Sequence, residues 1–159
     1  MSGLLYAATL ITALGCGLIA GVFFAFSTFV MPALKRLPAV EGIAAMQSIN
    51  RLAVTPALMT ALFGTAAACL ALVVWAAVSW GDRSAAPVLA GGALYLVGAI
   101  GVTIVRNVPL NERLAKLHPQ DTRAGGFWDE YLAKWTAWNH ARTAASLAAA
   151  TALTVAIQP

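Results

Sequence analysis

The chain has 159 residues, of which 60% are hydrophobic and 10% are charged, and its formal net charge at pH 7 is +4. A soluble domain of this size carries about a quarter of its residues as charged side chains, so the composition excludes an ordinary soluble fold. The basic excess comes without a nucleic-acid-binding motif. We therefore expect membrane lipids, and no nucleic acid, as partners.

Four charge-poor runs predict membrane-spanning helices, because each can cross a bilayer core of about 30 Å and none alternates as a β-strand does. The predicted spans are residues 4–31, 53–78, 88–106 and 135–157. The predicted fold class is all-α: an integral membrane four-helix bundle with short amphipathic cytoplasmic helices. We expect a single transmembrane domain over residues 1–159, since no linker or low-complexity segment divides the chain.

The first run begins at Leu4, is too long for a signal peptide and has no basic residue before it. Its small residues recur at every fourth position, which predicts close packing against a neighbouring helix, or a homo-oligomer through Gly17 and Gly21. These small residues are Thr9, Ala13, Gly17, Gly21 and Ala25. Pro32 is expected to end this helix, because a proline inside a helix removes a hydrogen bond.

Prolines and glycines also mark the second and third runs. Pro56 is expected at the start of the second helix, and Pro109 at the end of the third. Gly91, Gly98 and Gly101 in the third run predict the close approach of another helix, because a residue without a side chain lets two backbones come together.

Basic residues are distributed unequally between the two ends of the predicted bundle. Four spans place both termini and the Ser79–Pro87 loop on one side, where Arg83 is the only one of the 10 Lys and Arg residues. Positive residues concentrate in cytoplasmic segments, so we expect both termini outside the cytoplasm and the two other connections inside it. The predicted location is the cell (inner) membrane, which the chain crosses several times.

The segment Trp135–Thr143 places an amide, an imidazole and a guanidinium on a predicted membrane-spanning helix. The chain ends at residue 159, and the stretch after Arg142 rises about 25 Å as a helix, against roughly 30 Å for the bilayer core. Arg142 is therefore expected a few ångströms inside the hydrocarbon boundary. Ionisable groups at such depth are costly and usually functional, so this segment is the first candidate site.

Polar and aromatic side chains gather at the cytoplasmic ends of the predicted spans and would form a pocket there. Asn107 and Asn111 are four residues apart and share a helix face, as do Trp135, Asn139 and Arg142. Guanidinium groups stabilise an enolate or phenolate, amides orient carbonyl oxygens, and indole rings stack on a flat molecule. The full set is Asn50, Arg51, Arg106, Asn107, Asn111, Trp135, Trp138, Asn139, His140 and Arg142. The alternative is structural, with Arg and Asn satisfying helix-end carbonyls and each other.

His140 is the one base of this set that titrates near neutral pH. It would abstract a proton, pair with Asp129 or Glu130, or face lipid headgroups. Because it follows Asn139 directly, it points about 100° away from that residue. We predict His140, Arg142 and Asn139 as catalytic residues, and the rest of the set as substrate-binding residues.

We predict no metal and no cofactor. The sequence contains no HExxH motif, no Glu-xx-His carboxylate set and no glycine-rich phosphate loop. The sequence has two histidines, His118 and His140. Because His118 lies in a predicted loop, a haem held by both is not favoured. Cys16 and Cys69 have no CxxC motif around them, so we interpret both as small buried apolar residues.

Four segments resemble the anthrone oxygenase-like family of small four-span membrane proteins, many bacterial members of which have no assigned function. They are residues 21–32, 46–51, 107–111 (Asn-Val-Pro-Leu-Asn) and 135–143, which contains Trp-Asn-His-x-Arg-Thr. The resemblance covers the chain from about Leu10 to Thr151. Fungal relatives oxidise anthrones to anthraquinones with molecular oxygen, without a metal or flavin. The resemblance implies a site at Asn50, Arg51, Asn107, Asn111, Trp135, Asn139, His140 and Arg142.

These observations support two hypotheses of different classes. The first is a cofactor-independent oxygenase with a cytoplasm-facing pocket for a lipophilic anthrone- or hydroquinone-like aromatic. In this monooxygenase a base such as His140 removes a proton, Arg142 and the amides stabilise the anion, and the anion reacts directly with oxygen. The second is a non-catalytic membrane bundle that binds a lipid, a quinone or a partner protein. A transporter is less favoured, because no ionisable residue lies at mid-membrane.

Overall fold

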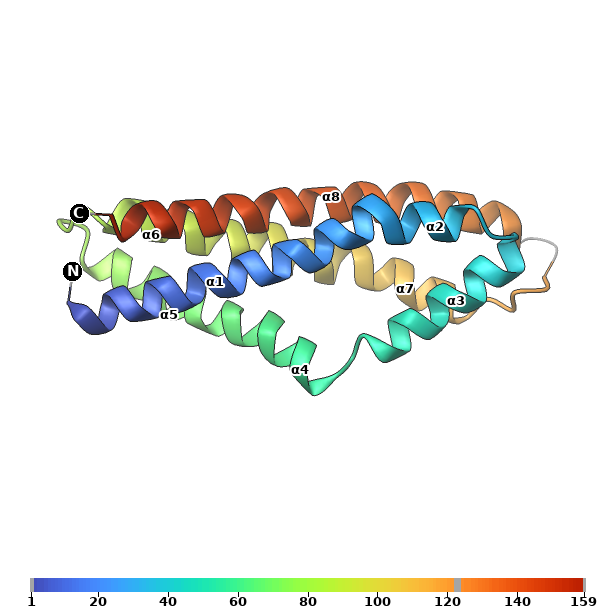
Figure 1. The fold of residues 1–159 in the computed structure, drawn as a ribbon, viewed down its shortest axis with the longest axis horizontal. Coiled ribbons are helices and arrows are strands. Elements are labelled where there is room, and N and C mark those ends of the chain that lie inside the picture. Colours follow the sequence, from blue (N-terminus) through green and yellow to red (C-terminus); the bar gives the residue numbers. More distant parts are fainter. Residues whose placement is uncertain (1, 122–123, 159) are drawn as a thin grey trace.

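The computed structural model describes residues 2–121 and 124–158, which form helices joined by short turns and contain no β-strand. Three helices in this part of the chain are long and apolar enough to cross a membrane. They cover Gly3–Lys35, Pro56–Val78 and Ala85–Ala115. The last helix, α8 (Ala124–Ala156), runs along the whole length of the bundle (Figure 1). The predicted all-α membrane bundle is thereby confirmed.

The first long helix continues through Pro32, so the prediction that it ends there was wrong. The wider turn of a π-helix precedes the proline, and this change of hydrogen-bonding pattern accommodates a residue that has no N–H to donate. The segments of this helix are α1 (Gly3–Ala25), the π-helical η1 (Phe26–Val30) and α2 (Met31–Lys35).

The third long helix repeats this arrangement at Pro109, which the sequence had placed at a helix end. Its segments are α6 (Ala85–Ala93), the π-helical η3 (Leu94–Gly101) and η4 (Thr103–Asn107), and α7 (Val108–Ala115). The second long helix does begin at Pro56, as predicted, and the Thr55 hydroxyl accepts a hydrogen bond from the Leu58 amide at 3.3 Å. Its segments are α4 (Pro56–Met59), the π-helical η2 (Thr60–Gly64) and α5 (Thr65–Val78).

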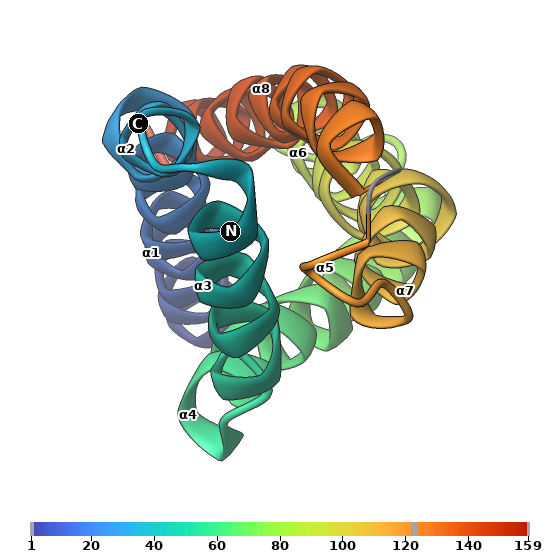
Figure 2. The ribbon, with the colours of Figure 1, turned by 90° about the vertical axis from the view of Figure 1, so that its right-hand side faces the viewer.

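The long helices form a ring in which α8 packs against α1 and α6, and α5 packs against α6 and α1 (Figure 2). Glycines set two of these contacts, since a Cβ on Gly91 would lie 2.8 Å from Leu153 Cγ of α8 and one on Gly98 would meet the Ala145 side chain. The predicted roles of Gly91 and Gly98 are confirmed, but that of Gly101 was wrong, because a Cβ there would meet only the Leu96 carbonyl oxygen of its own helix. Gly17 and Gly21 instead have open space around them, so they do not pack within the bundle.

The buried apolar side chains form two clusters, one at each end of the bundle. The first cluster lies toward the chain termini and includes Cys16 and Cys69, whose buried sulfur atoms are 3.9 Å apart. This burial confirms the interpretation of both cysteines. The second cluster contains Met31, Ile43, Met46, Leu114, Trp128, Tyr131 and Trp135.

The second cluster is closed by the amphipathic helix α3 (Ala39–Leu52), which lies against α7 and α8. The Gln47 side chain donates hydrogen bonds to the carbonyl oxygens of Leu114 and Leu117 at 2.8 and 3.0 Å. Gly42 of α3 lies on the indole of Trp128, where a Cβ would come within 2.8 Å of the ring. A helix with a side chain at this position would not pack as closely.

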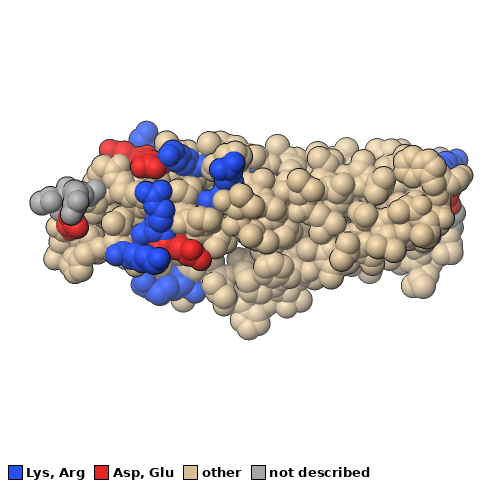
Figure 3. Space-filling model, turned by 180° about the vertical axis from the view of Figure 1, so that it is seen from behind, with Lys and Arg blue, Asp and Glu red and all other residues tan. Residues whose placement is uncertain are grey.

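Most Lys and Arg side chains lie at the end of the bundle that holds α2, α3, α7 and the start of α8, here called the charged end (Figure 3). The opposite end carries the turn between α5 and α6, with Asp82 and Arg83. There the hydroxyl and the amide of Ser84 donate to Asp82 Oδ1 at 2.6 and 2.8 Å, and these hydrogen bonds lower the pKa of that carboxyl.

Candidate functional site

Asn139 lies at the centre of a buried polar cluster between α8 and the first long helix. Its side chain is fully buried, and its Nδ2 donates to the Phe23 carbonyl oxygen at 2.6 Å and to Ser27 Oγ at 2.7 Å. Phe23 and Ser27 lie on either side of the point where α1 changes into η1. Asn139 therefore fixes α8 against this π-helical turn.

Arg142 follows one turn later on the same face and is only 5% exposed. Its Nη2 donates to Asn139 Oδ1 at 2.6 Å and its Nη1 donates to Thr103 Oγ1 at 3.1 Å. The guanidinium carbon lies 4.1 Å from the centroid of Phe23 and 5.1 Å from that of Trp135. These are cation–π distances, so the charge is held by ring faces and neutral oxygens.

No carboxylate pairs with Arg142 among residues 2–121 and 124–158, where the ion pairs found are those of Glu130. The Arg142 Nε also has no hydrogen-bond partner in that part of the chain. A buried guanidinium without a counterion is costly, because the charge has lost most of its hydration. The arrangement thus leaves one donor and one positive charge available to an anion.

Asn111 connects two aromatic residues of α8. Its Oδ1 accepts hydrogen bonds from the Tyr131 hydroxyl and from Trp135 Nε1, both at 2.8 Å. Asn50 of α3 also lies against the Tyr131 hydroxyl. Burial raises the pKa of Tyr131 above its ordinary range, so the phenol stays protonated and acts as a donor.

Asn107 extends this network toward Arg142. It is buried, and its Nδ2 donates to the Trp135 carbonyl oxygen at 3.2 Å. Thr103, Asn107 and Asn111 follow one another at intervals of four residues, and η4 brings all three toward α8. The structure therefore brings together six predicted site residues: Asn50, Asn107, Asn111, Trp135, Asn139 and Arg142.

The side chain of His140 faces a different space. It is exposed and lines an open groove of about 940 Å³ between α2 and α8. This groove, called the α2–α8 groove below, is lined by Met31, Pro32, Lys35, Arg36, Asp129, Leu132, Ala133, Thr136, Ala137 and His140. Asn139 and Arg142 are not part of it, in keeping with the angle of about 100° between consecutive helical residues.

Three further predicted residues stay outside the buried cluster. Arg51 is exposed at the end of α3. Arg106 is exposed, and its guanidinium carbon lies 4.7 Å from the centroid of the Trp138 ring. Arg106 and Trp138 line a shallow hollow of about 200 Å³ on the outer surface. This stacked pair belongs to the bundle surface, and the structure does not bring it to Arg142.

Sequence reasoning did not select four residues that complete the cluster: Phe23, Ser27, Thr103 and Tyr131. A signal for Thr103 existed, since it precedes Asn107 by four residues and therefore shares its face. Tyr131 belongs to the aromatic series of α8 that includes Trp128 and Trp135, which stack with ring centroids 5.6 and 6.4 Å from it. No sequence signal pointed to Ser27, because its position depends on the π-helical turn.

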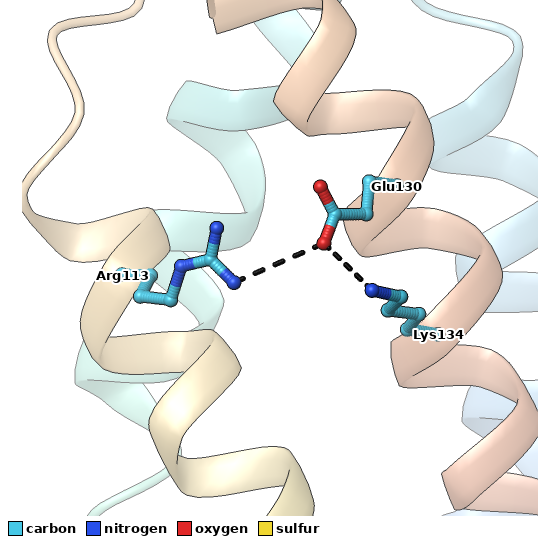
Figure 4. A network of polar contacts seen from close by, with 3 residues as sticks. All are labelled: Arg113, Glu130 and Lys134. Carbon is cyan, nitrogen blue, oxygen red and sulfur yellow. Dashed lines mark hydrogen bonds and ion pairs between the residues drawn. The ribbon is translucent and has the colours of Figure 1, made fainter.

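An exposed ionic network borders the site at the charged end (Figure 4). Glu130 Oε1 lies 2.9 Å from Lys134 Nζ and 3.8 Å from Arg113 Nη1. The hydrogen bond from Lys134, and the charges of Lys134 and Arg113, lower the pKa of Glu130 below its ordinary value. His140, for which Glu130 was one suggested partner, is not part of this network.

The described residues include no group of three or more His, Cys, Asp or Glu side chains placed to hold a metal ion. The absence of a metal and of a cofactor remains a prediction from the sequence.

Comparison with known proteins gives one match. A family model described as anthrone oxygenase matches residues 53–152. No curated protein and no solved structure matches the chain. The matched stretch includes Asn107, Asn111, Trp135, Asn139 and Arg142. The residues of α1 and α3 that contact them precede residue 53 and lie outside the match.

Proposed function

Because the chain belongs to the anthrone oxygenase family, we propose that it is a membrane oxygenase that acts on a lipophilic anthrone- or hydroquinone-like aromatic. The observation that carries this proposal is the buried guanidinium of Arg142, which has two aromatic neighbours, a free Nε and no carboxylate partner in the described part of the chain. Such a group stabilises negative charge that develops on a substrate oxygen.

The proposed chemistry needs a substrate that becomes an anion. An anthrone that loses a proton from the CH₂ group opposite its carbonyl in the central ring spreads the negative charge through the fused rings onto the carbonyl oxygen, which would accept a hydrogen bond from Arg142 Nε. The electron-rich carbon then adds molecular oxygen, and loss of water from the peroxide leaves a second carbonyl. The net change is CH₂ plus O₂ to C=O plus H₂O. The rings of Phe23 and Trp135 lie against the guanidinium itself, so they would hold it in place for the substrate oxygen.

Each remaining predicted site residue has a place in the proposal. Asn107 and Asn111 would orient the substrate through the ordered amides beside Trp135. His140 faces the α2–α8 groove, so it would remove a proton only from a substrate that lies in this groove. Arg51 and Arg106, both exposed, would act at the charged surface over which a substrate enters.

We also propose that the charged end faces the cytoplasm, with both termini outside it, in the cell (inner) membrane. The support is the unequal distribution of basic residues, because Arg83 stands apart from the other Lys and Arg side chains.

The test is oxidation by the purified protein in lipid nanodiscs. Several anthrones and hydroquinones are supplied in air, and quinone absorbance and oxygen consumption are followed together. We expect quinone formation above the buffer rate, and a return to about the buffer rate in Arg142→Gln. Arg113→Gln is the matched control, because this arginine lies at the same end but is exposed, and its partners are Glu130 and the ring of Phe127. A wild-type protein that forms no quinone above the buffer rate with any of these substrates would overturn the proposal.

A second candidate function rests on the α2–α8 groove. Lys35 and Arg36 line it at the end of the first long helix, beside apolar walls from Met31 and Leu132. Basic pockets of this kind bind anionic lipid headgroups. In this alternative the protein is a non-catalytic bundle that binds a lipid. Native mass spectrometry with anionic and zwitterionic phospholipids would then show selective retention of the anionic lipid, and its loss in Lys35→Gln/Arg36→Gln.

A further inference from the structure

One face of α8 carries a continuous series of buried polar and aromatic side chains, here called the polar stripe. Its members follow one another at intervals of three or four residues, which keeps them on one side of a helix. They are Trp128, Tyr131, Trp135, Asn139, Arg142 and Ser146, and all are buried. The stripe extends for about 27 Å at the rise of an α-helix. It begins in the cluster at the charged end and passes into the middle of the bundle.

Five buried side-chain atoms in the described part of the chain have no hydrogen-bond partner: Asn50 Nδ2, Asn107 Oδ1, Trp128 Nε1, Arg142 Nε and Ser146 Oγ. Three of them belong to the polar stripe. The other two residues border it, since Asn107 donates to the Trp135 carbonyl, and the Asn50 amide lies near the Tyr131 hydroxyl without meeting hydrogen-bond geometry. Unpaired polar groups are thus concentrated along one line through the bundle.

The chemistry of these five atoms limits what can satisfy them. The amide nitrogen of Asn50, the indole of Trp128 and the Nε of Arg142 are donors only, whereas Asn107 Oδ1 is an acceptor. A hydrocarbon chain would leave every one of them unpaired, which is unfavourable for a polar group in an apolar medium. Water accepts and donates at once, and buried water typically bonds to two to four otherwise unsatisfied groups.

We propose that the polar stripe holds a chain of hydrogen-bonded internal water molecules, here called the file. It extends from Asn50 and Trp128 at the charged end to Arg142 and Ser146. Such a file explains why unpaired atoms follow α8, and it supplies hydration to a buried guanidinium. Its use rests on the proposed function, because the oxidation releases one water molecule, and the proton lost in forming the substrate anion is taken up again when the peroxide forms. The file gives the product water a route to the charged end and carries the proton between these two steps without His140.

X-ray hydroxyl-radical footprinting tests the outer part of the file, because radiolysis of bound water modifies the side chains beside it. The chain offers a matched pair of fully buried tyrosines, Tyr131 on the stripe and Tyr95 outside it. The Tyr95 hydroxyl donates to the Leu62 carbonyl at 3.1 Å, and its ring belongs to the first apolar cluster. In nanodiscs without substrate, we expect Tyr131 to be modified several-fold faster than Tyr95. Equal, slow modification of both tyrosines would overturn the proposal.

Ser146→Cys tests the deep end in the same way. Cys16 and Cys69 are fully buried and serve as thiol controls within the same chain. We expect the thiol at position 146 to be oxidised several-fold faster than these two. Equal oxidation rates for all three thiols would mean that water reaches only the outer part of the stripe. This result would contradict a file that reaches Arg142. Neither measurement depends on catalytic turnover. Absence of internal water is therefore distinguishable from absence of quinone formation.

Discussion

The guanidinium carbon of Arg142 lies 4.1 Å from the centroid of the Phe23 ring. Phe23 belongs to the first apolar cluster, and Trp135, the other ring beside Arg142, belongs to the second. The arginine therefore lies at the junction of the two cores. Its position there explains why the residues around it affect both the packing of the bundle and the chemistry proposed for it.

Arg142→Lys separates the charge of this residue from its geometry. Lysine keeps the positive charge, but its three N–H donors sit on one nitrogen. It therefore cannot reach Asn139 and Thr103 and also place a donor at the position of Nε, as the planar guanidinium does. We expect quinone formation to fall by about 10²-fold, the loss typical of one stabilising donor. Quinone absorbance with saturating substrate measures this. A variant as active as the wild type would show that charge alone is sufficient.

Asn139→Ala should destabilise the bundle by about 3 kcal/mol, because it leaves the Phe23 carbonyl, Ser27 and Arg142 without a shared partner. Ser27→Ala removes only one of these bonds and should cost about 1 kcal/mol. Unfolding in a graded mixture of mild and denaturing detergent measures both. Equal losses in the two variants would contradict the central position assigned to Asn139.

Gly42→Ala should destabilise the charged end, because its Cβ would lie 2.8 Å from a carbon of the buried Trp128 ring. Inserting a methyl group into such a contact typically costs about 1–3 kcal/mol. Gly17→Ala is the control, since no atom lies within 4 Å of a Cβ there. Detergent unfolding and Trp fluorescence should change in the first variant only. A loss in Gly17→Ala would instead indicate contact with a second copy of the chain.

His140→Ala tests where the substrate loses its proton. The two sites compared are the α2–α8 groove, which His140 lines, and the buried cluster around Arg142. The side chain faces the α2–α8 groove, not Arg142, so we expect the rate to fall by less than the 10²–10⁴-fold that a general base typically contributes. The rate is measured with saturating substrate. A loss of 10²-fold or more would place the substrate in the groove.

Glu130→Gln should remove a small pH dependence of stability. The pKa of Glu130 is lower in the folded protein than its ordinary value of 4.5, chiefly through the hydrogen bond from Lys134. A carboxyl of this kind stabilises the fold above its unfolded-state pKa, and the contribution is lost as the pH falls through the lower folded-state value. The unfolding temperatures of wild type and variant should therefore converge as the pH falls from 4.5 through the lower folded-state pKa. A constant difference at every pH would argue against this ion pair.

The sequence was sufficient for the features that depend on composition and helical spacing. The apolar runs predicted the long helices, and intervals of three or four residues placed Asn107 with Asn111 and Asn139 beside Arg142 on their correct faces. The same geometry predicted that His140 would point away from Asn139. The prolines misled because helix breaking is a local rule, whereas Pro32 and Pro109 each follow a π-helical turn that lets the helix continue.

Partners across the bundle could not be predicted from one sequence. The bond from Asn139 to the Phe23 carbonyl joins residues on two helices whose relative rotation depends on every packed side chain between them. The position of Ser27 depends in addition on η1, for which the sequence offers no signature. Arg106 resembled Arg142 as a charged residue near a span end, and only the structure shows that one is exposed and the other buried.

The π-helical turns make the number of residues in each helix matter as much as their identity. One residue advances a helix by about 100°. A single deletion within Thr103–Asn107 would therefore rotate Asn107 and Asn111 away from α8 while leaving every apolar run and every predicted span in place. Homologues that vary freely in side chains on the outer face of this segment should thus tolerate no gap within it. An alignment gap there would mark the loss of the site in a protein that still inserts and folds.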